Sequence, residues 1–333
     1  MKIKVVGKVG RRDPLVFEYA PGYAFTHDVS CRAYDWLVVY DDLPQVERLA
    51  CPREHTILMT SEPTSIKGYS GTYVRQFGHL LTNRPPSAEN HPNYHLGRGY
   101  YRWLNGRTYL ENRDAVIPPK TQLISAVCSS KQMRLTRHFE RFRLISELAK
   151  RIPGFEWYGR GVRSFGKKFE VMDACKYHVA VENHIAPHHW SEKIADAILC
   201  ECLPFYAGAP DLAEDLPADS FIPIPIDDPD EAVRIIRTAM ANNEYERRLA
   251  AIREAKRLLL TRYNFWAQII EVIESCPSPV TSSADGTEIL YDRKSLRRRH
   301  PVAALEDGWW HLRQAFGLMS GRSEKWYNVE KGS

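Results

Sequence analysis

The sequence predicts an α/β protein with two domains. The clearest support is the stretch from residue 177 to residue 208, which is typical of a strand, a polar loop, a helix and a second strand. Short apolar segments separated by polar loops indicate another α/β domain in the first third of the chain. The chain has 333 residues, of which 44% are hydrophobic. Because a domain usually takes about 100 to 200 residues, this length accommodates two cores.

The first domain is expected to comprise residues 1–118. Residues 84–106 are rich in Pro, Asn, His, Tyr and Gly and favour an irregular surface segment. Residues 116–120 contain two consecutive prolines and are the best candidate for a linker. Strands are expected at the short apolar runs of this domain, which are residues 3–6, 36–40, 56–59 and 79–82.

The second domain is expected to comprise residues 119–275, beginning with a strand at residues 123–128 and a basic amphipathic helix. Farther along, residues 177–181 form a nearly continuous apolar run, as expected for a buried parallel strand. Polarity returns at Glu182 and Asn183. This end of the strand should open onto the crevice in which α/β sheets bind their ligands.

Ser191 is suited to cap a helix from about Glu192 to Cys202, because its hydroxyl can accept a backbone N–H of the first turn. The unpaired N–H groups of such a turn and the positive end of the helix dipole attract a phosphate or a carboxylate. Lys193 adds a full positive charge at this position. An ordinary βαβ unit with a capped helix explains the same pattern equally well.

Two groups of motifs lie between about residues 123 and 226. The first group is V-E-N at 181–183, W-S-E-K at 190–193, L-P-F-Y-A-G-A-P at 203–210 and D-S-F-I-P-I at 219–224. The second group is Ser129, Ser130, Lys131, Thr136, His138, Arg141, Leu144 and Leu148, followed by Y-G-R-G at 158–161. Together they resemble the signature of the family 10 glycosyltransferases, the α-1,3/1,4-fucosyltransferases and their bacterial lipopolysaccharide relatives.

The sequence departs from the family pattern at several positions. Arg137 stands where glycine is usual, and His184 stands where serine follows the Glu-Asn pair. His189 and Trp190 replace an Asp-Tyr pair, and Ser191 replaces threonine. Because this loop frames the sugar in the family, its changed polarity leaves fucose specificity open.

The resemblance implies a GT-B architecture, in which two Rossmann-like domains face each other across a cleft. Such enzymes hold the nucleotide sugar mainly in the C-terminal domain, place the acceptor against the N-terminal domain and usually need no metal. The implied reaction is an inverting transfer of L-fucose from GDP-fucose onto a hydroxyl of a glycan or lipid-linked glycan, in surface polysaccharide or lipopolysaccharide synthesis. A related transferase using another nucleotide sugar is one alternative, and a non-catalytic sugar-nucleotide-binding protein is another. A dinucleotide oxidoreductase is disfavoured because the G-x-G-x-x-G fingerprint is missing.

By the same resemblance, Arg141 binds the donor phosphates. A guanidinium grips a diphosphate through two parallel hydrogen bonds, which a lysine cannot reproduce. Lys193 is expected to meet the phosphates, and Glu192 is expected to accept hydrogen bonds from the ribose or the sugar. Glu182 and Asn183 would line the sugar pocket. The expected donor-binding residues are Arg141, Lys168, Glu182, Asn183, Ser191, Glu192 and Lys193.

An inverting transfer needs a general base for the acceptor hydroxyl and positive groups for the leaving diphosphate. The resemblance assigns the base to a glutamate in a turn after a strand of the first domain. Glu62 follows the apolar run at 56–59 and precedes Pro63, and it is therefore the candidate. Asp41 and Asp42, at the end of another strand, are the reserve candidates.

Simpler interpretations stay open for four positions. Glu62 fits equally well as an exposed loop carboxylate, and Arg141 fits as part of a solvated helix face. Lys167 and Lys168 could contact a phosphate, but a solvated side chain is the simpler interpretation for both.

Composition narrows the function classes. The formal net charge of +5 suits a phosphorylated donor and an anionic membrane or lipopolysaccharide surface, and no nucleic-acid-binding motif is present. The seven cysteines form no regular pairs, as expected for reduced thiols. His184, His188 and His189 have no cysteine partner and no H-E-x-x-H helix, so neither a metal nor a cofactor besides the donor is expected.

The chain begins directly with a strand-like segment and has no run of about 18 apolar residues, which predicts a cytoplasmic protein. Residues 276–333 form a basic and aromatic tail, with L-R-R-R-H at 296–300 and tryptophans at 309 and 310. Such a tail either packs back on the body of the protein or contacts the inner membrane peripherally.

Overall fold

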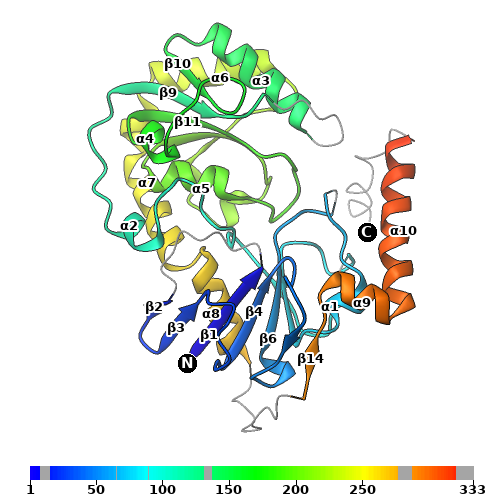
Figure 1. Cartoon of the computed structure of the whole chain (residues 1–333). Coiled ribbons are helices and arrows are strands. Elements are labelled where there is room, and N and C mark those ends of the chain that lie inside the picture. The colour runs from blue at the N-terminus through cyan, green and yellow to red at the C-terminus, as the bar shows by residue number, and fades with distance from the viewer. Residues whose placement is uncertain (8–15, 65, 89, 131–136, 277–286, 320–333) are drawn as a thin grey trace. The chain divides into compact units, whose positions relative to one another are not determined.

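A computed structural model describes residues 1–7, 16–64, 66–88, 90–130, 137–276 and 287–319 (Figure 1). The chain forms two compact units. Unit 1 comprises Met1–Gly97 and Gln268–Ser333, and unit 2 comprises Arg98–Ala267. Helix α8 (Phe265–Ser275) carries the chain from unit 2 back into unit 1.

The described part of unit 1 contains a seven-stranded sheet in the order β2-β3-β1-β4-β6-β7-β8. All neighbouring strands are parallel except β2 and β3, which form an antiparallel edge. The central strands are buried on both faces, which explains their continuous apolar runs. The strands are β1 (Lys2–Gly7), β2 (Val16–Ala20), β3 (Tyr23–Thr26), β4 (Trp36–Tyr40), β6 (Thr56–Thr60), β7 (His79–Thr82) and β8 (Tyr94–Leu96).

Segments near both ends of the chain meet in unit 1. The short strands β5 (Glu47–Arg48) and β14 (Ile289–Leu290) pair antiparallel. The Arg53 guanidinium pairs with the Glu288 carboxylate at 3.0 Å, and Leu49 N–H donates to the Glu288 carbonyl at 3.0 Å. Residues 287–312 therefore pack on this unit. Its helices are η1 (Arg53–His55), α1 (Gly71–Val74), α9 (Arg293–Arg299) and α10 (Pro301–Met319).

Unit 2 contains a five-stranded parallel sheet in the order β10-β9-β11-β12-β13, counted over its described residues. Helices α3 and α6 pack on one face of the sheet, and α5 and α7 pack on the other. The strands are β9 (Gln122–Val127), β10 (Phe155–Tyr158), β11 (Cys175–Val181), β12 (Leu203–Ala207) and β13 (Ile222–Pro223). The helices are α2 (Tyr109–Arg113), α3 (His138–Arg151), α4 (Lys168–Met172), α5 (Glu192–Leu199), η2 (Leu212–Glu214), η3 (Ala218–Ser220), α6 (Pro229–Ala241) and α7 (Glu244–Thr261).

The prediction of an α/β protein with two Rossmann-like units is confirmed, because each unit is a mainly parallel sheet with helices packed against it. The units divide the chain after residues 97 and 267, rather than after residues 118 and 275. Residues 98–118 join unit 2 because Leu104 N–H donates to the Asp196 carboxylate and Phe169 N–H donates to the Asn105 carbonyl. No described helix is long and apolar enough to cross a bilayer.

Candidate functional site

The start of α5 is built around a buried carboxylate. Glu182 directly follows β11 and is fully buried. Its Oε1 accepts the Ser191 backbone N–H at 3.0 Å, and its Oε2 accepts the Ser191 hydroxyl at 2.7 Å and the Lys193 ammonium at 3.0 Å. Ser191 caps the helix as predicted, because its hydroxyl also accepts the Lys193 backbone N–H. The carboxylate of Glu182 thus connects the loop to the start of α5. It was expected to line the sugar pocket, but in this structure it is fully buried.

Lys193 is held by acidic groups. Its ammonium donates to the Ser191 hydroxyl at 2.9 Å, to Glu182 at 3.0 Å and to Glu192 at 3.2 Å. Burial disfavours the charged amine, but the attraction of Glu182 and Glu192 outweighs it and raises the pKa of Lys193. Burial likewise opposes ionisation of Glu192, but Lys193 and Lys168 attract the carboxylate and lower the pKa of Glu192 to about 2. Both groups are therefore charged at neutral pH.

Lys168 lies at the start of α4 and pairs with Asp196 of α5 at 3.0 Å. Asp196 is fully buried, and burial raises its pKa although Lys168 acts in the opposite direction. Asp196 also accepts the Leu104 backbone N–H, so it ties two segments to the helix. The sequence prediction did not include Asp196. Its signal was a single acid within the apolar run of α5.

Arg141, Lys168 and Lys193 line one narrow cavity at the carboxyl ends of β9 and β11. The cavity measures about 20 Å³, which is room for about one water molecule. Cys128 also lines it, and the Arg141 guanidinium offsets part of the rise that burial causes in the pKa of that thiol. The three cations that were predicted from separate segments therefore converge on one opening.

Arg141 differs from the two lysines in its partners. Among the residues that the structure describes, it forms no ion pair with a carboxylate, and its Nε is buried without a hydrogen-bond partner. A buried guanidinium N–H without a partner is costly, and an anionic ligand in the cavity would satisfy it. Lys131 and Thr136 of the same predicted motif lie outside the described residues.

The loop between β11 and α5 contains the three histidines. His184 and His189 are buried, with their ring centroids 5.0 Å apart, and the Tyr101 hydroxyl lies 3.2 Å from His189 Nδ1. Asn183 is half-buried at the beginning of this loop, directly after Glu182. The loop is therefore mostly packed into unit 2.

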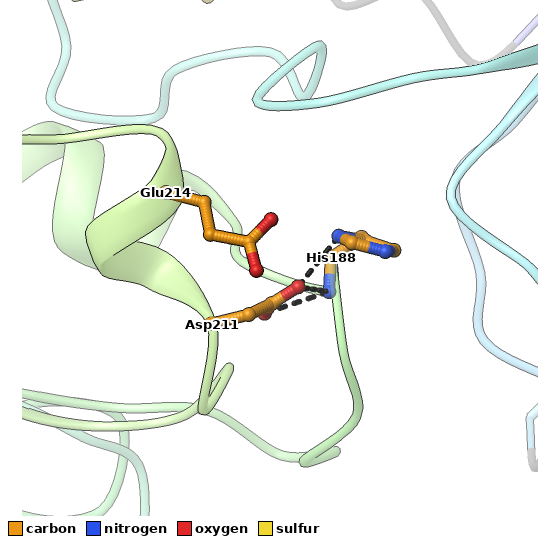
Figure 2. Close-up of side chains that lie close together, drawn as sticks. All are labelled: His188, Asp211 and Glu214. Atoms are coloured by element: carbon orange, nitrogen blue, oxygen red, sulfur yellow. Dashed lines mark hydrogen bonds and ion pairs between the residues drawn. The ribbon is translucent and has the colours of Figure 1, made fainter. Parts of the chain in front are cut away.

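His188 of the loop lies beside Asp211, which precedes η2, and Glu214, the last residue of η2 (Figure 2). The His188 backbone N–H donates to both Asp211 carboxylate oxygens at 2.9 Å, and His188 Nδ1 lies 2.5 Å from Asp211 Oδ2. These are ligand types of metal sites. Glu214 also pairs with Arg98 at 3.4 Å, and the same guanidinium pairs with Asp215 at 2.7 Å. The bonds between His188 and Asp211 tie the loop to η2.

Glu62 belongs to unit 1 and follows β6, as predicted. Its carbonyl accepts the Arg84 Nε at 3.0 Å and Nη2 at 2.6 Å. The neighbouring Ser61 donates its backbone N–H to the Asp41 carboxylate at 2.7 Å and its hydroxyl at 2.5 Å. Tyr69 donates to the same carboxylate. The turn that carries Glu62 is therefore held from both sides.

The reserve candidates for a general base are both engaged. Asp41 is fully buried, with its backbone at φ 65°, a left-handed conformation that non-glycine residues rarely adopt. Asp42 pairs with Lys67 and lies 3.8 Å from Arg293. The network of Arg84 and Tyr69 around these acids was not predicted, because its members come from separate segments of the chain.

No family model matches the chain, and no curated protein matches its sequence. Among solved structures, an α1,3-fucosyltransferase with GDP-fucose is similar at 16% identity and a TM-score of 0.49, covering 85% of this chain and 92% of that one. The same enzyme class with GDP gives 15% identity and a TM-score of 0.47, covering 86% and 92%. Anabaena HepE in complex with UDP gives 11% identity and a TM-score of 0.45, covering 73% and 79%.

Proposed function

We propose that the protein is a glycosyltransferase that binds the diphosphate of a nucleotide sugar in unit 2, with Arg141 as the principal phosphate ligand. The observation that carries this proposal is the Arg141 guanidinium, which lines a cavity with Lys168 and Lys193 and whose buried Nε has no hydrogen-bond partner among the described residues. The cavity lies at the carboxyl ends of β9 and β11, where open α/β sheets bind ligands. Its small volume admits no diphosphate, so the phosphates would occupy its mouth.

The two lysines have a different part in this proposal. Their ammonium groups are already bonded to Glu182, Glu192 and Asp196, and they add positive charge beneath the phosphates without giving up those bonds. Glu192 stays ionised at neutral pH and can accept a hydrogen bond from a ribose or sugar hydroxyl. Ser191 and Glu182 hold the start of the helix, and Asn183 stands where the sugar would meet the loop.

The finer reaction rests on the motif resemblance in residues 123–226. In this proposal L-fucose is transferred with inversion from GDP-fucose to a hydroxyl of a glycan or lipid-linked glycan, in the cytoplasm at the inner membrane. Glu62 removes the proton of the acceptor hydroxyl, and Arg141 stabilises the charge that develops on the leaving diphosphate. No metal takes part. Another nucleotide sugar is the second candidate donor, because His184, His189 and Trp190 alter the loop that frames the sugar.

The test of donor binding is a thermal-shift series with GDP, UDP, CMP and dTDP on the wild type and two variants. A nucleotide that binds only the folded protein stabilises it by about 2.7 kcal/mol at 100 times its Kd. We expect GDP to give the largest shift and Arg141→Ala to abolish it. Arg143→Ala is the matched control, because Arg143 is an exposed arginine of the same helix. Equal shifts for the two variants, or no shift with any nucleotide, would contradict the proposal.

Glu62→Gln separates an enzyme from a binding protein. The amide keeps the shape of the side chain but cannot accept the proton of the acceptor hydroxyl. We expect the variant to lose turnover of GDP-fucose while its thermal shift with GDP is unchanged. Normal turnover in this variant would remove Glu62 as the base, and an absence of turnover in the wild type with every donor would favour the binding protein.

A further inference from the structure

Helix α10 is fixed to unit 1 along one face. Ala303 is fully buried, and Glu306 accepts the Thr72 backbone N–H at the start of α1 at 2.9 Å. Asp307 is buried and pairs with Arg293 at 3.1 Å and Arg297 at 3.3 Å. Helices α9 and α10 therefore form one element on this unit (orange to red in Figure 1).

The opposite face of α10 is apolar and open to solvent. Val302, Leu305, Trp309 and Leu312 are 57%, 72%, 60% and 52% exposed. Their spacing of three, four and three residues places them on one side of the helix, away from the anchoring residues. Single exposed hydrophobic residues are common, but a continuous row of four is typical of a docking surface. We call these four residues the apolar stripe.

Basic residues lie immediately before the stripe. Lys294, Arg297, Arg298 and Arg299 of α9 are exposed, and only one of them, Arg297, pairs with an acid among the described residues. None of the exposed residues between 301 and 312 is acidic. The face therefore combines aliphatic side chains, a tryptophan and a group of arginines. The partly exposed acid Glu306 beside it accepts the Thr72 N–H and lies 3.7 Å from Arg75.

We propose that the α9–α10 element is a peripheral docking surface for a membrane that contains anionic lipids. The apolar stripe would enter the boundary between headgroups and acyl chains, and the α9 cations would contact the lipid phosphates. A second copy of the chain fits the face less well. The exposed positions beside the stripe are Ala304, Gly308 and His311, so the alternating charges that flank a coiled-coil seam are missing. The proposal is independent of the reaction that the protein catalyses.

The test is cosedimentation of the full-length chain with vesicles of phosphatidylcholine alone or mixed with phosphatidylglycerol. We expect binding to the mixed vesicles that weakens as salt is added. The double variant Leu305→Ser/Trp309→Ser should lower the partition coefficient about a hundredfold, because two large apolar side chains are lost. Lys294→Ser/Arg298→Ser should lower it about thirtyfold on the mixed vesicles. Val116→Ser is the control, because Val116 is 91% exposed outside the element and should have no effect.

Light scattering without lipid tests whether a second copy of the chain covers the apolar stripe. We expect the wild type and both double variants to have the mass of one chain. A wild type of twice that mass, converted to single chains by Leu305→Ser/Trp309→Ser, would show that a second copy covers the stripe and would overturn the lipid proposal. The lipid proposal is also overturned if the wild type does not sediment with the mixed vesicles, or if Leu305→Ser/Trp309→Ser sediments as the wild type does.

Discussion

Lys193→Ala tests whether the buried charges at the start of α5 hold this region together. In the wild type the ammonium lies 3.0 Å from Glu182, which is fully buried, and 3.2 Å from Glu192. Lowering the pKa of Glu192 from 4.5 to about 2 corresponds to about 3 kcal/mol of stability at neutral pH. Breaking a buried ion pair by removing one partner costs about 3 to 5 kcal/mol. Lys168 and Ser191 also lower the pKa of Glu192, so only part of the first figure belongs to Lys193, and we expect a loss of about 3 to 4 kcal/mol at pH 7.

The loss should depend on pH with a definite sign. A carboxyl group whose pKa is lowered by folding adds stability above its unfolded pKa, and that stability is lost as the pH falls through the folded pKa. For Glu192 this window lies between about 4.5 and 2. The gap between wild type and variant should therefore be constant above about pH 5 and smaller at pH 3.

Urea unfolding, monitored by hydrogen exchange of the α5 amides, measures the difference in unfolding free energy between wild type and variant in unit 2. Lys176→Ala is the control, because Lys176 forms a partly exposed ion pair with Glu246 and should cost less than about 1 kcal/mol. If Lys193→Ala is no more destabilising than the control, or if its deficit is the same at pH 7 and pH 3, the proposed role of the buried charges is wrong.

Three further predictions concern the site residues. Arg141→Lys keeps the charge but loses the two parallel hydrogen bonds, so the Kd for GDP in calorimetry should rise at least about tenfold; an unchanged Kd would contradict a two-bond contact. Glu192→Gln should weaken nucleotide-sugar binding more than GDP binding if its carboxylate meets the sugar, and both equally if it meets the ribose. Asp41→Asn places an amide against the donors of Ser61 and should lower the free energy of unfolding in urea by about 1 to 3 kcal/mol. It should also lower kcat by a larger factor than it changes KM. The control Asp114→Asn, at an exposed position, should have neither effect.

Much of the fold could be predicted because its strands and helices are marked locally in the sequence by apolar runs and capping residues. The apolar run before Glu182 is β11, and the hydroxyl of Ser191 caps α5 where the sequence indicated it. The helix ends at Leu199 rather than Cys202, and Glu201 adopts φ 52° as the chain turns into β12. Helix ends depend on the following turn, which leaves a weaker signal than an apolar period.

Other features could not be predicted because they depend on contacts between distant segments. Glu182 was expected to face a sugar, but it is buried by Ser191 and Lys193, nine and eleven residues later. The pairing of β5 with β14 joins strands of two residues each across most of the chain. Such short strands have no periodic pattern, and their position is fixed by the surrounding packing.

A crystal structure of the protein with GDP would show where the diphosphate lies relative to Arg141. We predict the β-phosphate at the mouth of the cavity formed by Arg141, Lys168 and Lys193, with two oxygens within hydrogen-bond distance of the Arg141 guanidinium. A diphosphate bound elsewhere on the chain, or an Arg141 side chain that turns to a protein carboxylate while the nucleotide is bound, would contradict it.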